Sequence, residues 1–117
     1  MLYISNAFSL AMLPDWRLTD AQSATRVTIE PVINVRLFFR SLIEDHGGFI
    51  SAVGHPDTAA AFSELLDAQI PANRVSIKLG GDDDLLIGQF MGGRLPEGTT
   101  TLPPGLKIQW LHLAIES

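Results

Sequence analysis

Residues 49–69 have the sequence FISAVGHPDTAAAFSELLDAQ, in which two hydrophobic patterns follow one another. The run from Phe49 to Val53 is mostly apolar and is bounded by glycines, which predicts a central strand of a sheet. From Asp57 to Gln69 the apolar residues recur at helical spacing, so that Phe62 and Leu66 share one face. These residues therefore predict a strand that leads directly into an amphipathic helix.

The junction between this strand and this helix is a candidate site for an anionic ligand. A helix start exposes backbone N–H groups and the positive end of the helix dipole, so the N–H groups of Asp57 and Thr58 can bind a phosphate. Pro56 suits the first helical position, because its missing N–H has no partner there in any case. The imidazole of His55 can donate a proton during phosphate-ester cleavage near neutral pH. The alternative is that His55 only caps the helix.

A second amphipathic helix is predicted between Asn34, a suitable N-cap, and Gly47, a suitable C-terminal stop. Its apolar residues lie on one face, and they are Val35, Phe38, Phe39, Leu42 and Ile43. Such a face is expected to pack against a sheet.

Short strands are predicted at three further places, which are Leu2–Ser5, Thr25–Glu30 and Lys107–Ile115. The alternation from Val75 to Leu79 is followed, after a glycine-rich loop, by the apolar run Leu85–Phe90, which predicts a β-hairpin. Strands that alternate with helices predict an α/β fold, here a mixed β-sheet of about five strands with helices packed on it.

The composition is that of an ordinary globular protein, with 46% hydrophobic and 18% charged residues in a chain of 117. Residues 1–117 are therefore predicted to form a single domain. The chain has no cysteine, which excludes disulfides, thiolate nucleophiles and cysteine zinc sites. No apolar run approaches the ~20 residues of a membrane helix, and no signal peptide is recognisable. We expect a cytoplasmic protein without a membrane partner.

The net charge of −5 argues against binding of a long nucleic acid through a broad basic face. It does not argue against a small anionic ligand. A compact phosphate compound can be held by a few arginines and backbone N–H groups, and Arg74 and Arg94 are available for this.

The run Asp82, Asp83 and Asp84 could suggest a divalent-metal site, but it falls at the tip of the predicted hairpin, where a solvated turn is expected. The histidines show no metal spacing either. His46 fits the C-terminal end of a helix, and His112 alternates with core residues of the last strand. We therefore expect no metal and no cofactor.

The segment Met91–Gly105 has neither helical nor strand periodicity, and connections of this length are often binding loops. Its only charged side chains are Arg94 and Glu97, which suit a phosphate ligand and an acid–base carboxylate. Asn6 and Ser9 follow the first strand, where polar side chains of α/β sheets can bind phosphate or ribose. The alternatives are an irregular surface loop and ordinary turn residues.

Four short blocks, in order along most of the chain, carry a family resemblance. They are Asn6-Ala7-Phe8-Ser9 with Met12-Leu13, Gly54-His55, Asn73-Arg74-Val75 with Ile77-Lys78-Leu79, and Arg94-Leu95 with Glu97-Gly98. Together they resemble the viral type III anti-CRISPR ring nucleases and their cellular CRISPR-associated relatives. The sequence departs from the viral pattern at Ala11, where an asparagine is frequent, and in a longer stretch between Gln89 and Arg94.

The resemblance implies a metal-independent enzyme that linearises cyclic tetra-adenylate, the second messenger of type III CRISPR systems. By this likeness His55 is the catalytic histidine and Glu97 is its carboxylate partner. Other residues of the blocks and their surroundings would hold the ring, and these are Asn6, Ser9, Arg74, Ile77, Gln89 and Arg94. The resemblance further implies a homodimer with the ligand between its subunits, and the host cytoplasm as the location if the protein is viral.

The chemistry of such a cleavage needs no external nucleophile. The protein would place a ribose 2′-hydroxyl in line with the departing 5′-oxygen, and products would end in a 2′,3′-cyclic phosphate. The N–H groups of Asp57 and Thr58, with Arg94, would stabilise the phosphorane-like charge, and His55 would protonate the leaving oxygen. Two other functions remain open: a module that sequesters a nucleotide without cleaving it, and a small protein-interaction domain.

Overall fold

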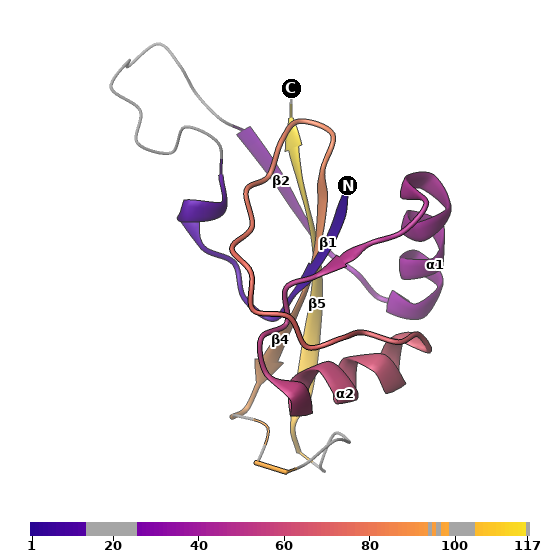
Figure 1. Cartoon of the computed structure of the whole chain (residues 1–117), viewed down its shortest axis with the longest axis vertical. Helices are drawn as coiled ribbons and strands as arrows, with labels where there is room; N and C mark the ends of the chain where they lie inside the picture. Colours follow the sequence, from indigo (N-terminus) through magenta and orange to yellow (C-terminus); the bar gives the residue numbers. More distant parts are fainter. Residues whose placement is uncertain (14–25, 94, 96, 99–104, 117) are drawn as a thin grey trace.

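The computed structural model describes residues 1–13, 26–93, 95, 97–98 and 105–116. Within these residues five strands form one sheet in the order β2-β5-β4-β1-β3 (Figure 1). The strands are β1 (Leu2–Ser5), β2 (Arg26–Pro31), β3 (Ile50–Ser51), β4 (Asp84–Met91) and β5 (Lys107–Glu116). The helices are the 3-10 helix η1 (Leu10–Met12), α1 (Val35–His46) and α2 (Pro56–Leu66). The predicted α/β class with a mixed sheet is confirmed.

Strands β1, β3 and β4 run parallel, since β1 pairs in parallel with each of the other two. Strand β5 is antiparallel to both of its neighbours, β4 and β2. The carboxyl ends of the three parallel strands therefore meet at one edge of the sheet, which is where α/β sheets usually bind their ligands. Asn6 directly follows β1, and His55 follows β3 after a short connection.

Local sequence explains where both α-helices begin and end. The Asn34 side chain accepts a hydrogen bond from the Leu37 N–H at the start of α1, and Gly47 ends the helix with a φ of 76°. Helix α2 begins at Pro56, as its fixed φ favours. It ends before the predicted Gln69, because Asp67 adopts a left-handed conformation with a φ of 54°. No helix in the described part of the chain is long and apolar enough to span a membrane.

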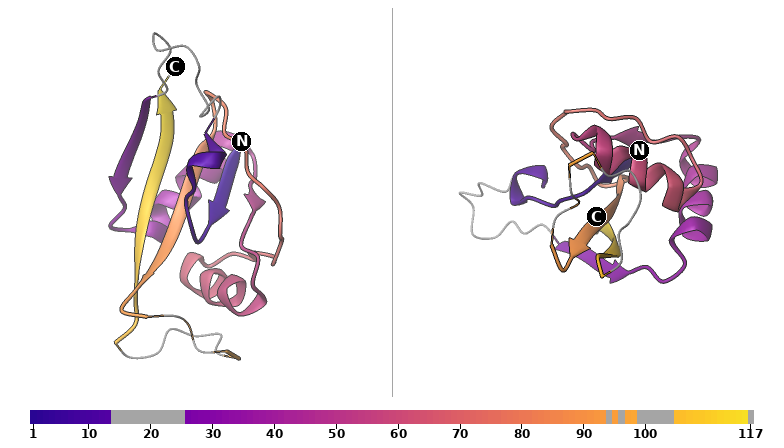
Figure 2. Two further views of the ribbon diagram at one scale, coloured as in Figure 1. Left: turned by 90° about the vertical axis from the view of Figure 1, so that its left-hand side faces the viewer. Right: turned by 90° about the horizontal axis from the view of Figure 1, so that it is seen from below.

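The two faces of the sheet are covered differently (Figure 2). Helices α1 and α2 pack on one face, where Phe39 and Phe62 join Leu86 of β4 and Trp110 of β5 in the larger core cluster. The opposite face is partly covered by η1 and by the extended segment 75–79, which contribute to a smaller cluster. The sheet is thus buried on both sides near its centre.

Gly88 lets the larger core pack closely. A Cβ atom at this position would lie 2.6 Å from Phe62 and 2.7 Å from Trp110. The two rings contact each other, with centroids 4.8 Å apart. A side chain at position 88 would therefore separate α2 from the sheet.

One strand prediction was correct only in part and another was wrong, because other strands occupy the places that the predictions gave them. The predicted central strand at Phe49–Val53 is reduced to Ile50–Ser51 and lies at the sheet's edge, since β4 occupies the other side of β1. Residues 75–79 form no strand, because β4 pairs with β1 on one side and with β5 on the other. Their alternation instead reflects burial on one side of the segment, because Ile77 and Leu79 pack in the smaller cluster.

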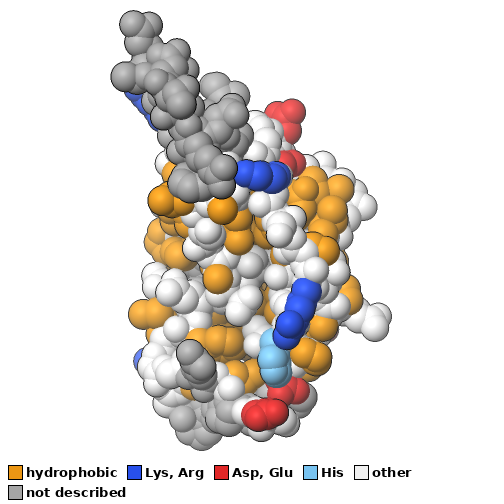
Figure 3. Space-filling view, turned by 60° about the vertical axis from the view of Figure 1, so that its left-hand side comes forward, with side chains coloured by type: hydrophobic (Ala, Val, Ile, Leu, Met, Phe, Trp, Pro, Cys, Tyr) orange, Lys and Arg blue, Asp and Glu red, His pale blue; other side chains and the backbone are white. Residues whose placement is uncertain are grey.

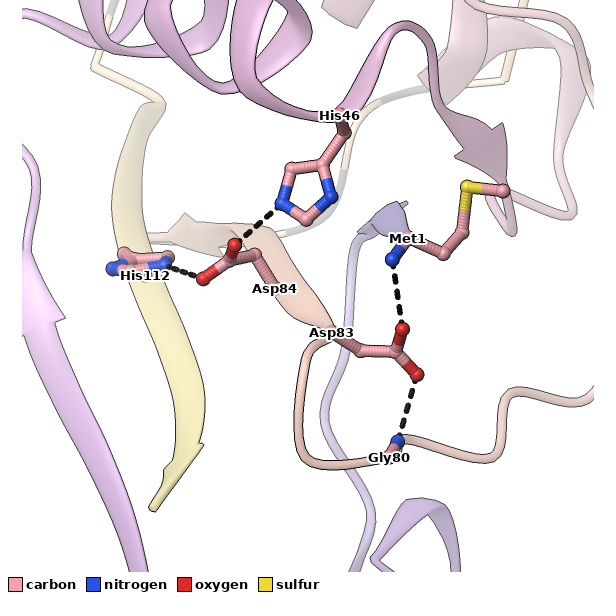
Figure 4. Close-up of polar contacts among 6 residues, drawn as sticks. All are labelled: Met1, His46, Gly80, Asp83, Asp84 and His112. Carbon is pink, nitrogen blue, oxygen red and sulfur yellow. Dashed lines mark hydrogen bonds and ion pairs between the residues drawn. The ribbon is translucent and has the colours of Figure 1, made fainter. Parts of the chain in front are cut away.

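The prediction of a solvated turn at the aspartate run was also wrong for two of its members. The Asp83 carboxylate accepts hydrogen bonds from the Gly80 N–H and from the N-terminal amino group. Asp84 begins β4, and its two carboxylate oxygens each lie 2.6 Å from an imidazole Nε2, one of His46 and one of His112 (Figure 4). This cluster joins α1, β4 and β5.

Candidate active site

A cleft of about 640 Å³ opens at the edge where the parallel strands end. It is lined from three directions: the end of β1, the start of α2, and the end of β4 with the loop that follows. The lining residues are Asn6, His55, Asp57, Thr58, Gln89, Phe90, Gly93, Leu95 and Glu97. Segments far apart in the sequence thus meet in one hollow of ordinary ligand-binding size.

His55 is both the N-cap of α2 and an exposed side chain of this cleft. Its backbone is extended, with φ −110° and ψ 129°, and its Nδ1 accepts the Asp57 N–H at 3.1 Å. Since Nδ1 is the acceptor, the neutral ring carries its proton on Nε2. The ring remains 54% exposed. The capping role weighed from the sequence is therefore confirmed, and it leaves Nε2–H available to a ligand.

The same hydrogen bond changes the expected role of one backbone group. The Asp57 N–H was predicted to bind phosphate, but the His55 ring occupies it. An anion at the start of α2 would have to displace the imidazole from this N–H.

The Asp57 side chain links the start of α2 to the loop after β4. Its Oδ2 accepts the Gly98 N–H at 2.7 Å, across 41 positions of sequence. The same oxygen lies 4.0 Å from Nδ1 of His55. Glu97 precedes Gly98 and lines the cleft with His55, so one chain brings the predicted histidine and carboxylate together.

Six of the residues selected from the sequence line this cleft: Asn6, His55, Asp57, Thr58, Gln89 and Glu97. Figure 3 shows the surface at this end, where a histidine side chain lies between basic and acidic side chains with hydrophobic ones nearby. Phe90, Gly93 and Leu95 also line the cleft and were not selected. The apolar run that ends at Phe90 could have identified that residue, because it continues the strand from Gln89.

Three other selected residues do not line the cleft as described. Ser9 caps η1, and its Oγ accepts the Ala11 N–H. Arg74 donates its Nε–H to the Gly54 carbonyl at 3.1 Å, so it supports the turn before His55. Ile77 is only 4% exposed and belongs to the smaller core cluster. Arg94 lies outside the described residues.

A second cavity of about 300 Å³ adjoins the cleft and shares Asn6 and Gln89 with it. Its other lining residues come from the less covered face of the sheet, and they are Ala7, Phe8, Ile29, Ile87 and Leu111. Asn6 and Gln89 therefore border both hollows.

The described residues contain no group of three or more histidine, aspartate or glutamate side chains arranged to hold a metal ion. At the cluster around Asp84, each imidazole Nε2 is directed at a different carboxylate oxygen. Burial alone would raise the pKa of Asp84, but hydrogen bonds from His46 and His112 and their positive charge outweigh it. The pKa of this carboxyl is therefore lowered from its ordinary value.

Comparison with known proteins gives a consistent relationship. A family model described as STIV B116-like matches residues 2–106. "Uncharacterized protein 26" of Sulfolobus islandicus filamentous virus (isolate Iceland/Hveragerdi) is 37% identical over 98 residues, which are 84% of this chain and 74% of that protein. The structure of B116 of Sulfolobus turreted icosahedral virus is similar with a TM-score of 0.73 and 27% identity, covering 97% of both chains.

Proposed function

This chain belongs to the STIV B116-like family of viral proteins, and we propose that it is a metal-independent ring nuclease that linearises cyclic tetra-adenylate. The activity removes the second messenger of type III CRISPR systems in the cytoplasm of the infected host. The observation that carries the proposal is the meeting of His55 and Glu97 in one cleft at the carboxyl edge of the parallel strands.

The other lining residues support a nucleotide as the ligand. Asn6 and Gln89 each offer an amide that can both donate and accept hydrogen bonds to a base or a ribose. Phe90 offers an aromatic ring, on which a base can stack. Arg74, next to the turn that carries His55, and Arg94, by the family resemblance, provide positive charge for the phosphates.

In the proposed reaction the 2′-oxygen of one ribose forms a bond to the adjacent phosphorus, and the bond from phosphorus to the 5′-oxygen breaks. Glu97 accepts the proton of the 2′-hydroxyl, and protonated His55 gives a proton to the 5′-oxygen. The products are a 2′,3′-cyclic phosphate and a free 5′-hydroxyl. The histidine contributes about 10²–10⁴-fold to such a step. Holding the 2′-oxygen in line supplies several kcal/mol more.

A homodimer follows from the size of the ligand. The cleft of about 640 Å³ is that of an ordinary small-molecule site, which is small for a ring of four nucleotides. Such a ring has approximate two-fold symmetry. Two copies of this chain can therefore contact opposite halves of the ring with identical residues.

The proposal is tested by incubating the protein with cyclic tri-, tetra- and hexa-adenylate in EDTA and identifying the products by mass. We expect many turnovers of the tetra-adenylate to linear products that end in a 2′,3′-cyclic phosphate. Binding in a fixed ratio without any product would instead identify a sequestering module. No affinity for any of the three rings would indicate a protein-interaction domain.

A further inference from the structure

Asp57 is the point at which the two sides of the cleft are joined. Its backbone N–H is donated to Nδ1 of His55 at 3.1 Å, on the α2 side. Its Oδ2 accepts the Gly98 N–H at 2.7 Å, on the side of the loop that carries Glu97. The side chain is only 23% exposed, so water competes weakly for this carboxylate.

The two protonation states of His55 need different partners at Nδ1. The neutral ring uses the lone pair of Nδ1 to accept the Asp57 N–H. The protonated ring carries a hydrogen on Nδ1 and cannot accept that bond. Oδ2 of Asp57 lies 4.0 Å from Nδ1, so an anionic acceptor stands beside this nitrogen. One residue thus flanks Nδ1 with both its backbone N–H and its carboxylate.

The contact with Gly98 fixes the neighbouring Glu97. Gly98 has a φ of 79°, which glycine adopts readily and other residues do not, so the chain turns sharply after the glutamate. The hydrogen bond to Asp57 holds this turn against the start of α2. Without it, the backbone at Glu97 loses its described contact with the histidine side of the cleft.

We infer that Asp57 is a positioning residue of the nuclease: its backbone N–H orients the His55 ring through Nδ1, and its carboxylate holds Glu97 at the cleft through Gly98. The inference rests on the proposed function. The other charged side chains of the described residues around His55 are Glu97, on the loop side, and Arg74, whose Nε–H is donated to the Gly54 carbonyl. Of these side chains, Asp57 is the one whose carboxylate lies beside the His55 ring and also accepts a hydrogen bond from the loop that carries Glu97.

Two substitutions test the carboxylate of Asp57. Asp57→Ala removes the acceptor of the Gly98 N–H, and kcat should fall about tenfold with a smaller change in KM, because Glu97 is no longer held beside the histidine. Asp57→Asn keeps an oxygen that can accept this N–H and should restore most of the rate. Both variants keep the backbone N–H that bonds Nδ1 of His55.

The matched control is Asp67→Asn, at the other end of α2. Asp67 is an exposed carboxylate that pairs with Arg40 and has no contact with the cleft. Asparagine also tolerates the left-handed conformation of this position. The control should leave kcat, KM and the pH profile unchanged. An Asp57→Ala variant with the same kcat as this control would overturn the inference.

A measurement on the ligand-free protein separates this inference from the proposed function. Amide exchange at Gly98, followed by NMR, should be faster in Asp57→Ala than in the wild type and unchanged in Asp57→Asn. If the wild type cleaves no ring, the nuclease proposal fails. If the exchange rate at Gly98 does not rise in Asp57→Ala, the inference about Asp57 fails, whatever the activity.

Discussion

The two ends of strand β4 carry the same kinds of side chain, histidine beside aspartate, in opposite surroundings. At its beginning Asp84 lies between His46 and His112, whose side chains are 14% and 19% exposed. At its end the cleft contains His55, which is 54% exposed, with the carboxylate of Asp57 at 4.0 Å. In the first group each Nε2 is bonded to the carboxylate, whereas the described contacts of His55 involve only Nδ1.

The difference shows that residue type alone does not decide whether such a group does chemistry. Partial burial and a hydrogen bond at each Nε2 make the Asp84 group a structural tie between α1, β4 and β5. Exposure in a cleft and a ring nitrogen without a partner among the described residues leave the Nε2–H of His55 available to a ligand.

The largest expected effect is that of His55→Asn. Asparagine is a good N-cap, so this variant keeps the start of α2 while it removes the imidazole. The cleavage rate should fall by about 10²–10⁴-fold, because proton donation to the leaving oxygen is lost. Single-turnover assays measure the rate, and calorimetric titration should show that ring binding is largely retained. Turnover close to that of the wild type would remove His55 from the mechanism.

The second prediction concerns the half-buried Asp84 group at the start of β4, where a loss of stability rather than of rate is expected. Asp84→Ala leaves two imidazoles without their acceptor, and the free energy of unfolding should fall by about 1–3 kcal/mol. Urea unfolding measures this loss, and the neighbouring exposed Asp82→Ala serves as the control that should change little. The rate per folded molecule should stay near that of the wild type. A loss of rate without a loss of stability would show that the Asp84 group, like the cleft, takes part in the reaction.

The sequence predicts these two ends unequally well, for a physical reason. His55 was found because a strand end, a proline and a helix start are local features. The partners of Asp84 lie 38 and 28 positions away, at His46 and His112, and such pairs depend on the tertiary fold. The meeting of Glu97 with His55 is equally distant, and only the family resemblance indicated it.

The fold, too, could be predicted from the sequence only where local features decide it. The alternation at 75–79 identified Ile77 and Leu79 as buried, but a strand also needs a free edge, and β4 has none to offer. Ile77 was expected to touch the ligand and instead lies in the core. Side-chain periodicity therefore agrees with the burial of Ile77 and Leu79 but not with Val75, which is 46% exposed, and hydrogen-bond partners and ligand contacts required the complete sheet.

A smaller effect is expected in the response of stability to pH at the Asp84 end. The lowered pKa of Asp84 means that its carboxylate stabilises the fold above the ordinary range of aspartate, about pH 4, and that this contribution is lost as the pH falls through the lowered value. The difference in unfolding free energy between wild type and Asp84→Asn should therefore shrink in acid. Urea unfolding at several pH values measures this difference. A difference that stays constant in acid would contradict the stabilising role of the Asp84 carboxylate.

The smallest expected effect is that of metal removal, for which no change is predicted at either end. At the Asp84 group both Nε2 atoms face a carboxylate oxygen at 2.6 Å, so a metal ion would have to replace two hydrogen bonds. At the cleft, Nδ1 of His55 is engaged by a backbone N–H. EDTA should leave the cleavage rate unchanged, and added zinc should leave the unfolding temperature unchanged, since a ligand raises it only by binding the folded state. A zinc-dependent rise of the unfolding temperature in the wild type that disappears in Asp84→Ala would identify the Asp84 group as a metal site. The two ends of β4 would then differ in the ligand that each binds rather than in their exposure to solvent.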